Sequence, residues 1–515
     1  MSNKRPAWIE EIVGDDDALE TDDTPVKRKK GPLSPVQILV LGVLGLILCG
    51  VFGSLVGVVV FRNSLFGSPA QESVAVSGST TPAEVVELLP TATSTPTFTP
   101  FPTVALPEPA ATPEPTPTAT YAVAPAFINK DKIRDITVFV EKWRELSLPE
   151  PLPIEFLTRR QLRDQWGEQS YEQETLEAVQ TQQQFYTALG LIEPDVDLMQ
   201  AALDTQSDIL LGYYTPDEKV MYIIAESVNM FAQEEMTFAH EYVHALQDYH
   251  FDLGTYLNNN GSADALLAAR SLPEGDARLV EELFTYQNIT KDQLDYTVYR
   301  YLFQEHPEIE GVSPALGIFT YFPYTAGEYF VVYLYIEGNF TWDKVNQAYR
   351  NPPISTEQVM HPEKYLAGER AVVVNLPDLA PVLGSAWHEL DRNVLGEAGF
   401  LVWLIDKVES QVAIDGAAGW DGDAYTLWTN EDNQRLVAEL SQWESNAEAS
   451  QFLEAFTDYM NLREENSTRY EEGDVQFWED KGGITLLSRQ GQRVLVLIAP
   501  DRATLDQVRS QFANF

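Results

Sequence analysis

The chain of 515 residues is too long for one ordinary core, so two or three folded units are expected. Its 44% of hydrophobic and 11% of aromatic residues are typical of a chain that mostly folds. The formal net charge of -44 argues against nucleic acid and anionic lipid surfaces as partners, because both would repel it. Since Cys49 is the only cysteine, neither an intrachain disulfide nor a cysteine-based zinc site can form.

The N-terminal region has the pattern of a membrane anchor. Residues 1–34 are polar and are expected to form a disordered cytoplasmic tail. The apolar stretch that follows, 35–62, is long enough to cross about 30 Å of hydrocarbon, and it exceeds the apolar length of about 7–15 residues in a cleaved signal peptide. Lys and Arg crowd its N-terminal side, while none occurs between Arg62 and Lys130. The positive-inside rule therefore predicts a single-pass protein of the cell membrane with its remaining chain outside the cytoplasm.

Residues 63–125 are rich in Pro, Thr, Ser and Ala, and they are predicted to form a disordered, extended stalk. Two folded units are expected after it, over 126–380 and 381–515. The first elements predicted in chain order are helices at 131–146 and 158–189. A β-hairpin at 210–224 follows, with its turn at Thr215 to Lys219.

A helix predicted over 233–249 contains the run His240-Glu-Tyr-Val-His244. Histidines at positions i and i+4 lie on one face of a helix, about 5–6 Å apart at Cβ, so both rings can reach one cation. Glu241 lies beside them, where a general base can take a proton from water. This HExxH arrangement is typical of zinc hydrolases, and it predicts one catalytic zinc ion on a buried helix.

A catalytic zinc ion needs a third protein ligand, and two residues compete for the role. His250 has the spacing of the last histidine in HExxHxxGxxH, but Gln247 stands where that motif has the glycine that turns the chain. Pro273 is well placed to start a helix, so Glu274 is expected in its first turn, and Gly275 would allow a close approach to the zinc helix. The sequence favours Glu274 and leaves His250 as the alternative.

The run HEYVHALQDY resembles the zinc helix of gluzincins of the thermolysin kind, which carry an aspartate at the position of Asp248. The Glu274-Gly-x-Ala pattern resembles that of many smaller gluzincins. The resemblance implies a zincin-like metallopeptidase domain over 126–380, mostly helical with a small sheet and an edge strand, in which Asp248 orients a ligand histidine. It covers mainly the hairpin and the two metal-binding helices. It departs from thermolysin itself, whose glutamate ligand lies in an Asn-Glu-x-x-x-Asp pattern nearer the second histidine.

A group that stabilises the oxyanion of the tetrahedral intermediate is also expected, and Tyr324 and His361 are the two candidates. His361 precedes a proline, which biases it out of helical geometry into a loop. Ser355 and Gln358 form a capping-box pattern just before it. The alternative interpretations are a packed aromatic for Tyr324 and an incidental histidine in a helix–loop–helix connector for His361.

The unit over 381–515 is predicted to be an α+β domain with its helices on one side of a sheet. Its expected elements are a helix at 386–407, strands at 420–428 and 435–439, a helix at 447–462, a hairpin of 484–488 and 494–498, and a final helix at 503–512. Trp420, Asp421 and Asp423 are interpreted as a tight turn with a core tryptophan rather than a binding loop. No catalytic cluster occurs in this unit.

These patterns together predict a membrane-anchored, extracytoplasmic zinc metallopeptidase acting on peptide or protein substrates, with Glu241 as general base. Two alternatives stay open from the sequence alone. One is a surface or binding protein that keeps a zincin fold without turnover. The other is a zinc amidase acting on cell-envelope material.

Overall fold

The structure is a computed structural model that describes residues 130–162, 173–198, 210–224, 230–258, 261–294, 311–463, 467–513 and 515. All of these residues belong to one compact unit. The predicted tail (1–34), membrane helix (35–62) and stalk (63–125) lie outside the described residues. Within the described ranges, no helix is long and apolar enough to cross a membrane.

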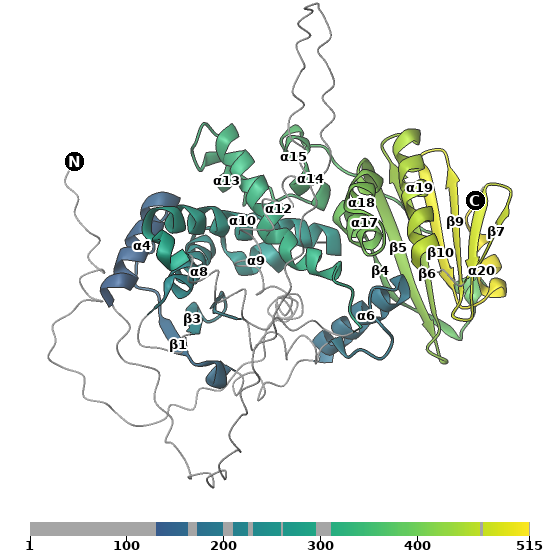
Figure 1. The fold of residues 1–515 in the computed structure, drawn as a ribbon, viewed down its shortest axis with the longest axis horizontal. Coiled ribbons are helices and arrows are strands. Elements are labelled where there is room, and N and C mark those ends of the chain that lie inside the picture. The colour runs from purple at the N-terminus through teal and green to yellow at the C-terminus, as the bar shows by residue number, and fades with distance from the viewer. Residues whose placement is uncertain are drawn as a thin grey trace, which may run out of the picture. The chain divides into compact units, whose positions relative to one another are not determined.

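The described residues before the C-terminal sheet are mostly helical (Figure 1). The helices are α4 (Lys130–Arg144), α6 (Gln173–Leu189), α8 (Ala232–Phe251), α9 (Leu253–Asn258), α10 (Ala263–Asn288), α12 (Leu316–Glu337), α13 (Asp343–Ala348), α14 (Thr356–Met360), α15 (Pro362–Ala367) and α16 (Ala380–Leu383). A small sheet holds β1 (Ile154–Leu157), β2 (Gly212–Thr215) and β3 (Val220–Ile224) in the order β1-β3-β2. β2 pairs antiparallel with β3 and is an edge strand, so the predicted hairpin is confirmed.

The C-terminal part is built on a seven-stranded sheet in the order β4-β5-β6-β10-β9-β8-β7, in which every neighbouring pair is antiparallel. Its strands are β4 (Trp387–Asn393), β5 (Trp420–Asn430), β6 (Arg435–Trp443), β7 (Thr468–Glu472), β8 (Val475–Glu479), β9 (Ile484–Gln490) and β10 (Arg493–Ala499). Its helices are α17 (Gly396–Ile405), α18 (Ser410–Ala417), α19 (Asn446–Arg463) and α20 (Arg502–Arg509). The α+β class predicted from the sequence is therefore confirmed at this level.

Two details of the C-terminal prediction are wrong. Helices cover both faces of the sheet, because successive residues of β6 such as Leu436 and Val437 are both buried and face separate cores, one including α20 and the other including α17 and α19. The helix predicted at 386–407 is instead β4 followed by α17. Gly396 has φ +76°, and the Asp423 carboxylate accepts the N–H groups of Leu395 at 2.8 Å and Gly396 at 2.9 Å, which starts the helix there.

The expectation that Pro273 starts a helix is also wrong. α10 begins after Ser262, whose side chain accepts the N–H of Ala265, and Pro273 lies inside it. A proline cannot donate to the carbonyl one turn earlier, which costs about 3 kcal/mol in an ordinary helix. Here the hydroxyl of Tyr256 donates to that carbonyl, on Ala269, at 2.8 Å. A side chain distant in sequence thus satisfies the carbonyl that Pro273 leaves without an N–H partner.

Gly275, the residue after Glu274, allows a close approach to α12 and not to the helix expected from the sequence. A Cβ on Gly275 would lie 2.0 Å from the carbonyl oxygen of Gly327, and a Cβ on Gly327 would lie 2.1 Å from that of Ser271. Gly275 therefore allows α10 to meet α12 backbone to backbone, and the expected close approach is not to α8. This contact fixes the turn of α10 that carries Glu274.

Candidate metal centre

α8 positions two histidines on one face, as its predicted extent over 233–249 required. His240 is 7% exposed, and the Nε2 atoms of His240 and His244 lie 3.1 Å apart. Phe238, Val243 and other apolar residues of α8 are completely buried, which holds the helix in the core. The spacing in the sequence therefore produces two convergent imidazole nitrogens.

α10 brings the carboxylate of Glu274 to the same point. Its Oε2 atom lies 3.2 Å from Nε2 of His240 and 3.3 Å from Nε2 of His244. These three side chains form a group that could hold a metal ion. A tetrahedral ion with bonds of about 2.0–2.1 Å separates its ligand atoms by roughly 3.3 Å, so the three distances fit such an ion.

In both histidines a hydrogen bond occupies Nδ1 and leaves Nε2 available to bind a cation. Nδ1 of His240 faces Oε2 of Glu281 at 3.1 Å, and Nδ1 of His244 faces Oε1 of Gln247 at 2.9 Å. Gln247 in turn donates from Nε2 to the carbonyl of Pro273 at 3.0 Å, which fixes its amide orientation. With a proton on each Nδ1, both Nε2 lone pairs point at the Glu274 carboxylate, and only a cation stabilises that arrangement.

The charges around the cluster agree with this assignment. Burial lowers the pKa of His240, but the carboxylates of Glu274 and Glu281 outweigh that and raise it to about 10. Burial raises the pKa of Glu274, but the two histidines lower it overall. The site therefore attracts positive charge, whether a proton or a metal ion. The side chain of Glu274 keeps 23% exposure, so water reaches one side of the cluster.

Glu281 and Gln247 were not recognised as functional residues from the sequence. Glu281 lies seven residues after Glu274, two turns along α10, and Arg278 binds its Oε2 atom at 2.8 Å. That spacing on one helix face is the signal that could have found it. The chain Arg278–Glu281–His240 orients the first histidine, which was the role expected of Asp248.

The expectation for Asp248 is wrong in the described contacts. Its carboxylate accepts the hydroxyl of Tyr214 at 2.7 Å and pairs with Lys219, so it ties the β-hairpin to α8. His250 stays on α8, as expected for a helix without the metzincin glycine. Its ring donates to the carbonyl of Ser147 at 3.0 Å, away from the cluster that Glu274 completes.

Glu241 lies between the cluster and the edge strand. Burial raises its pKa, while His244 and His240 and the backbone N–H of Tyr214 on β2 lower it. A carboxyl group in this position is near the candidate ligands and near the free edge of β2. Its raised pKa favours uptake of a proton.

The structure brings one oxyanion candidate to the site and not the other. The rings of Tyr324 and His240 lie 5.9 Å apart, and burial together with the charges of Glu274 and Glu241 raises the pKa of Tyr324 well above its usual value. Its hydroxyl therefore stays protonated. His361 adopts the predicted non-helical geometry between α14 and α15, but it bonds Glu397 at 3.0 Å, and its described ion-pair partners do not include the cluster.

The turn of α10 that carries the ligand is fixed from the opposite side by a buried ion pair. Asp276, two residues after Glu274, receives Nε of Arg144 at 2.7 Å and the hydroxyl of Tyr349 at 2.7 Å. The guanidinium of Arg144 lies 4.3 Å from the ring centroid of Trp342. Both charged side chains are fully buried, so breaking the pair would cost about 3–5 kcal/mol.

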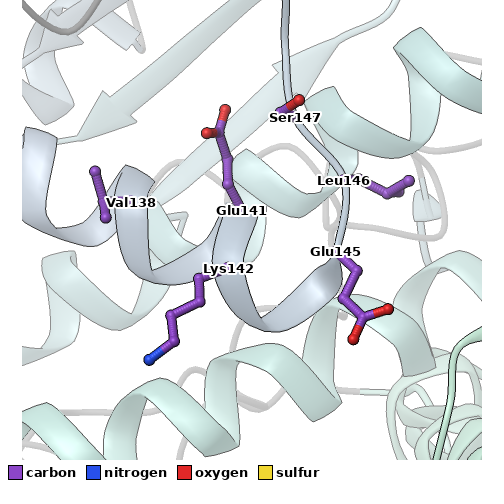
Figure 2. Close-up of a pocket in the computed structure, with 6 residues that line it drawn as sticks. All are labelled: Val138, Glu141, Lys142, Glu145, Leu146 and Ser147. Carbon is purple, nitrogen blue, oxygen red and sulfur yellow. The ribbon is translucent and has the colours of Figure 1, made fainter. Parts of the chain in front are cut away.

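A surface cavity of about 320 Å³ lies elsewhere, lined by Val138, Glu141, Lys142, Glu145, Leu146 and Ser147 (Figure 2). None of these residues belongs to the His/Glu cluster. The carboxylate of Glu141 accepts the hydroxyl of Tyr242, which is on α8, at 3.0 Å. The cavity is therefore separate from the candidate metal ligands.

Comparison with known proteins gives one match. A family model described as a domain of unknown function (DUF8575) matches residues 383–509. No curated protein and no solved structure matches the chain. The matched segment contains the C-terminal sheet from β4 to β10 and does not include α8 or α10. The match therefore concerns the sheet and not the cluster of His240, His244 and Glu274.

Proposed function

We propose that the chain is a zincin-like, gluzincin-type zinc metallopeptidase. The observation that supports it is the convergence of His240, His244 and Glu274 at tetrahedral spacing, with Glu241 beside them. Two imidazoles and one carboxylate are a ligand set of catalytic zinc sites that keep a position for water. An intact Glu241 favours an enzyme over a binding protein, because a purely structural site has no use for a base.

A zinc ion held by the three ligands supplies Lewis acidity, activating water near neutral pH and polarising a carbonyl group. Glu241 takes the proton of the attacking water and delivers it to the leaving amine. Tyr324, kept protonated by its surroundings, donates a hydrogen bond to the substrate oxygen that becomes negative. Glu281 and Gln247 hold the two rings in the required tautomer.

The free edge of β2 suits an extended peptide. Among the described strands, β2 pairs with β3 alone, and Asp248 links Tyr214 of β2 to α8 beside Glu241. A substrate backbone can add to this edge as another strand and pass in front of the general base. A peptide bond is thus a better match to the site than an isolated amide of cell-envelope material.

We also propose that the apolar stretch 35–62 anchors the enzyme in the cell membrane, with the catalytic part outside the cytoplasm. The support is the sequence pattern of a long apolar run with basic residues on its N-terminal side.

The test uses the full chain, purified in detergent, and its Glu241→Gln variant. Metal analysis should find one zinc ion per chain in both proteins. A peptide library or casein should be cleaved by the wild type, with the rate about 10²- to 10⁴-fold lower in the variant. Bound zinc with no cleavage of any peptide would instead support the surface-protein alternative.

A further inference from the structure

Arg270 on α10 is a buried cation, and two of its nitrogen atoms have no hydrogen-bond partner in the part of the chain that the structure describes. Its residue exposure is 9%, and its Nε and Nη2 atoms are both buried without a hydrogen-bond acceptor among the described residues. Charged donors that are left without an acceptor in the interior destabilise the folded state. The chain has 78 acidic residues, yet none of those described pairs with Arg270. This favours a bound ligand as the source of the missing acceptor.

The other two buried arginines of the described residues show the contrast. Arg144 pairs with Asp276 at 2.7 Å, and Arg278 pairs with Glu281 at 2.8 Å. Each therefore has an internal carboxylate, which is the usual condition for a buried charge. Arg270 alone among the three lacks one within ion-pair distance in the described ranges.

Arg270 lies next to the metal cluster. It is one helical turn before Glu274 on α10, so the two side chains share a helix face. Tyr324 comes from α12, one turn before Gly327, which touches Ser271 backbone to backbone. Burial lowers the pKa of the Arg270 guanidinium to about 10, although the negative charge of Glu274 opposes this shift.

The two unpartnered atoms are the ones that match a carboxylate. In a guanidinium group, Nε–H and one N–H of Nη2 lie parallel on a single edge and bind both oxygens of a carboxylate. We propose, on the basis of the metallopeptidase function above, that Arg270 binds a carboxylate of the substrate next to the scissile bond. The enzyme is then specific for acidic peptides or for peptide C-termini.

The experiment separates these two sources of a carboxylate. Peptides of one sequence that the wild type binds are compared as four versions, with the C-terminus free or amidated and with Glu or Gln at one internal position. The full-length wild type in detergent should prefer one carboxylate-bearing version by about 10- to 100-fold in kcat/KM. Arg270→Gln should lose that preference while keeping its zinc ion, and Arg270→Lys, which keeps the charge but not the paired donors, should retain only part of it.

Arg350→Gln is the matched control, because it removes the same charge from an exposed position. It should keep the wild-type preference. Arg270→Gln should unfold at no lower temperature than the wild type, since it removes an unpaired buried charge. An unchanged preference in Arg270→Gln, or an equal loss of rate on all four peptides, would overturn the assignment.

A binding measurement keeps this inference separate from the proposed function. Titration calorimetry of Glu241→Gln with the four peptides needs no turnover, and it should show the same carboxylate preference. The double variant Glu241→Gln, Arg270→Gln should bind the four peptides without that preference. If the wild type cleaves nothing but this preference is found, the peptidase assignment fails and the carboxylate site stands. If the peptides are cleaved with no preference in either measurement, the carboxylate site is wrong and the peptidase stands.

Discussion

Two groups of side chains in the described residues bring three ligand atoms within 4.8 Å of one another, and they differ in what neutralises them. In the group of Glu357, Glu369 and Glu444, the Nζ atom of Lys364 contacts all three carboxylates, at 2.6 Å for Glu357 and 3.1 Å for Glu369. The group of His240, His244 and Glu274 has no ammonium or guanidinium within ion-pair distance among the described residues.

The difference shows that a cluster of acidic residues is not by itself a metal site. The Lys364 cluster supplies its own cation, so its carboxylates need no other. Beside the His/Glu cluster, Arg278 pairs with Glu281, the residue that contacts Nδ1 of His240. The imidazole nitrogens of the His/Glu cluster face the Glu274 carboxylate, an arrangement that could hold a metal ion.

The largest expected effect breaks the His/Glu cluster directly. Glu274→Ala removes one of three ligands and should weaken zinc binding by more than about 100-fold, because loss of an outer partner alone costs about 10–100-fold. His250→Ala should leave zinc content unchanged, as should Glu369→Ala in the Lys364 cluster. The measurement is zinc per chain after dialysis against a graded series of chelator concentrations. Zinc loss in His250→Ala but not in Glu274→Ala would sink the gluzincin assignment.

A smaller effect is expected from the residue that orients His240. Glu281→Gln removes the carboxylate from Nδ1 and should lower zinc affinity about 10- to 100-fold without unfolding the chain. Competition with a chromophoric chelator measures the affinity. Glu282→Gln is the neighbouring control, because Glu282 is half exposed and pairs with Arg278 at 3.4 Å without touching a histidine. Equal affinities in the two variants would contradict the orienting role.

What the sequence could predict depends on how local the cause is. His240, His244 and Glu241 follow from a spacing within one helix, so they were found at once. The sequence wrongly predicts that a helix starts at Pro273. Pro273 is tolerated inside α10 because the Tyr256 hydroxyl donates to the carbonyl of Ala269, a contact that no local sequence pattern indicates.

Partners in space were missed for the same reason. Glu281 and Gln247 gain their roles only when α8 and α10 face each other. The sequence predicts a helix where β4 lies, because the side chains of this edge strand are only half-buried and show no clear alternation.

The Lys364 cluster can be broken in its turn. Burial raises the pKa of Glu357 to about 7, although Lys364 lowers it, so Lys364→Met should raise it further. A carboxyl group whose pKa is higher in the folded state stabilises most below its unfolded pKa of about 4.3, and the contribution is lost as the pH rises to the folded pKa. Lys364→Met should therefore cost about 1–3 kcal/mol at pH 8 and less at pH 5 by urea unfolding. An equal loss at both pH values would show that Lys364 acts through packing alone.

Glu439 extends the comparison, because no lysine pairs with it among the described residues and it belongs to neither candidate metal-binding group. It lies in the middle of β6, is 1% exposed, and neither of its carboxyl oxygens has a partner among the described residues. Burial, with a smaller contribution from Asp423, raises its pKa well above the usual value, so a proton neutralises it where Lys364 neutralises Glu357.

The last expected effect is on the pH dependence of stability. In the wild type, Glu439 should lower the free energy of unfolding by up to about 1.4 kcal/mol for each pH unit between its unfolded and folded pKa values. The reason is that the folded state keeps the proton over this range. Glu439→Gln keeps the neutral shape and cannot ionise, so its stability should fall less steeply from pH 5 to pH 9. Thermal unfolding across this range measures the slope. Identical slopes for the two proteins would mean that Glu439 ionises in the folded state as easily as in the unfolded chain. A nearby cation would then be stabilising its carboxylate.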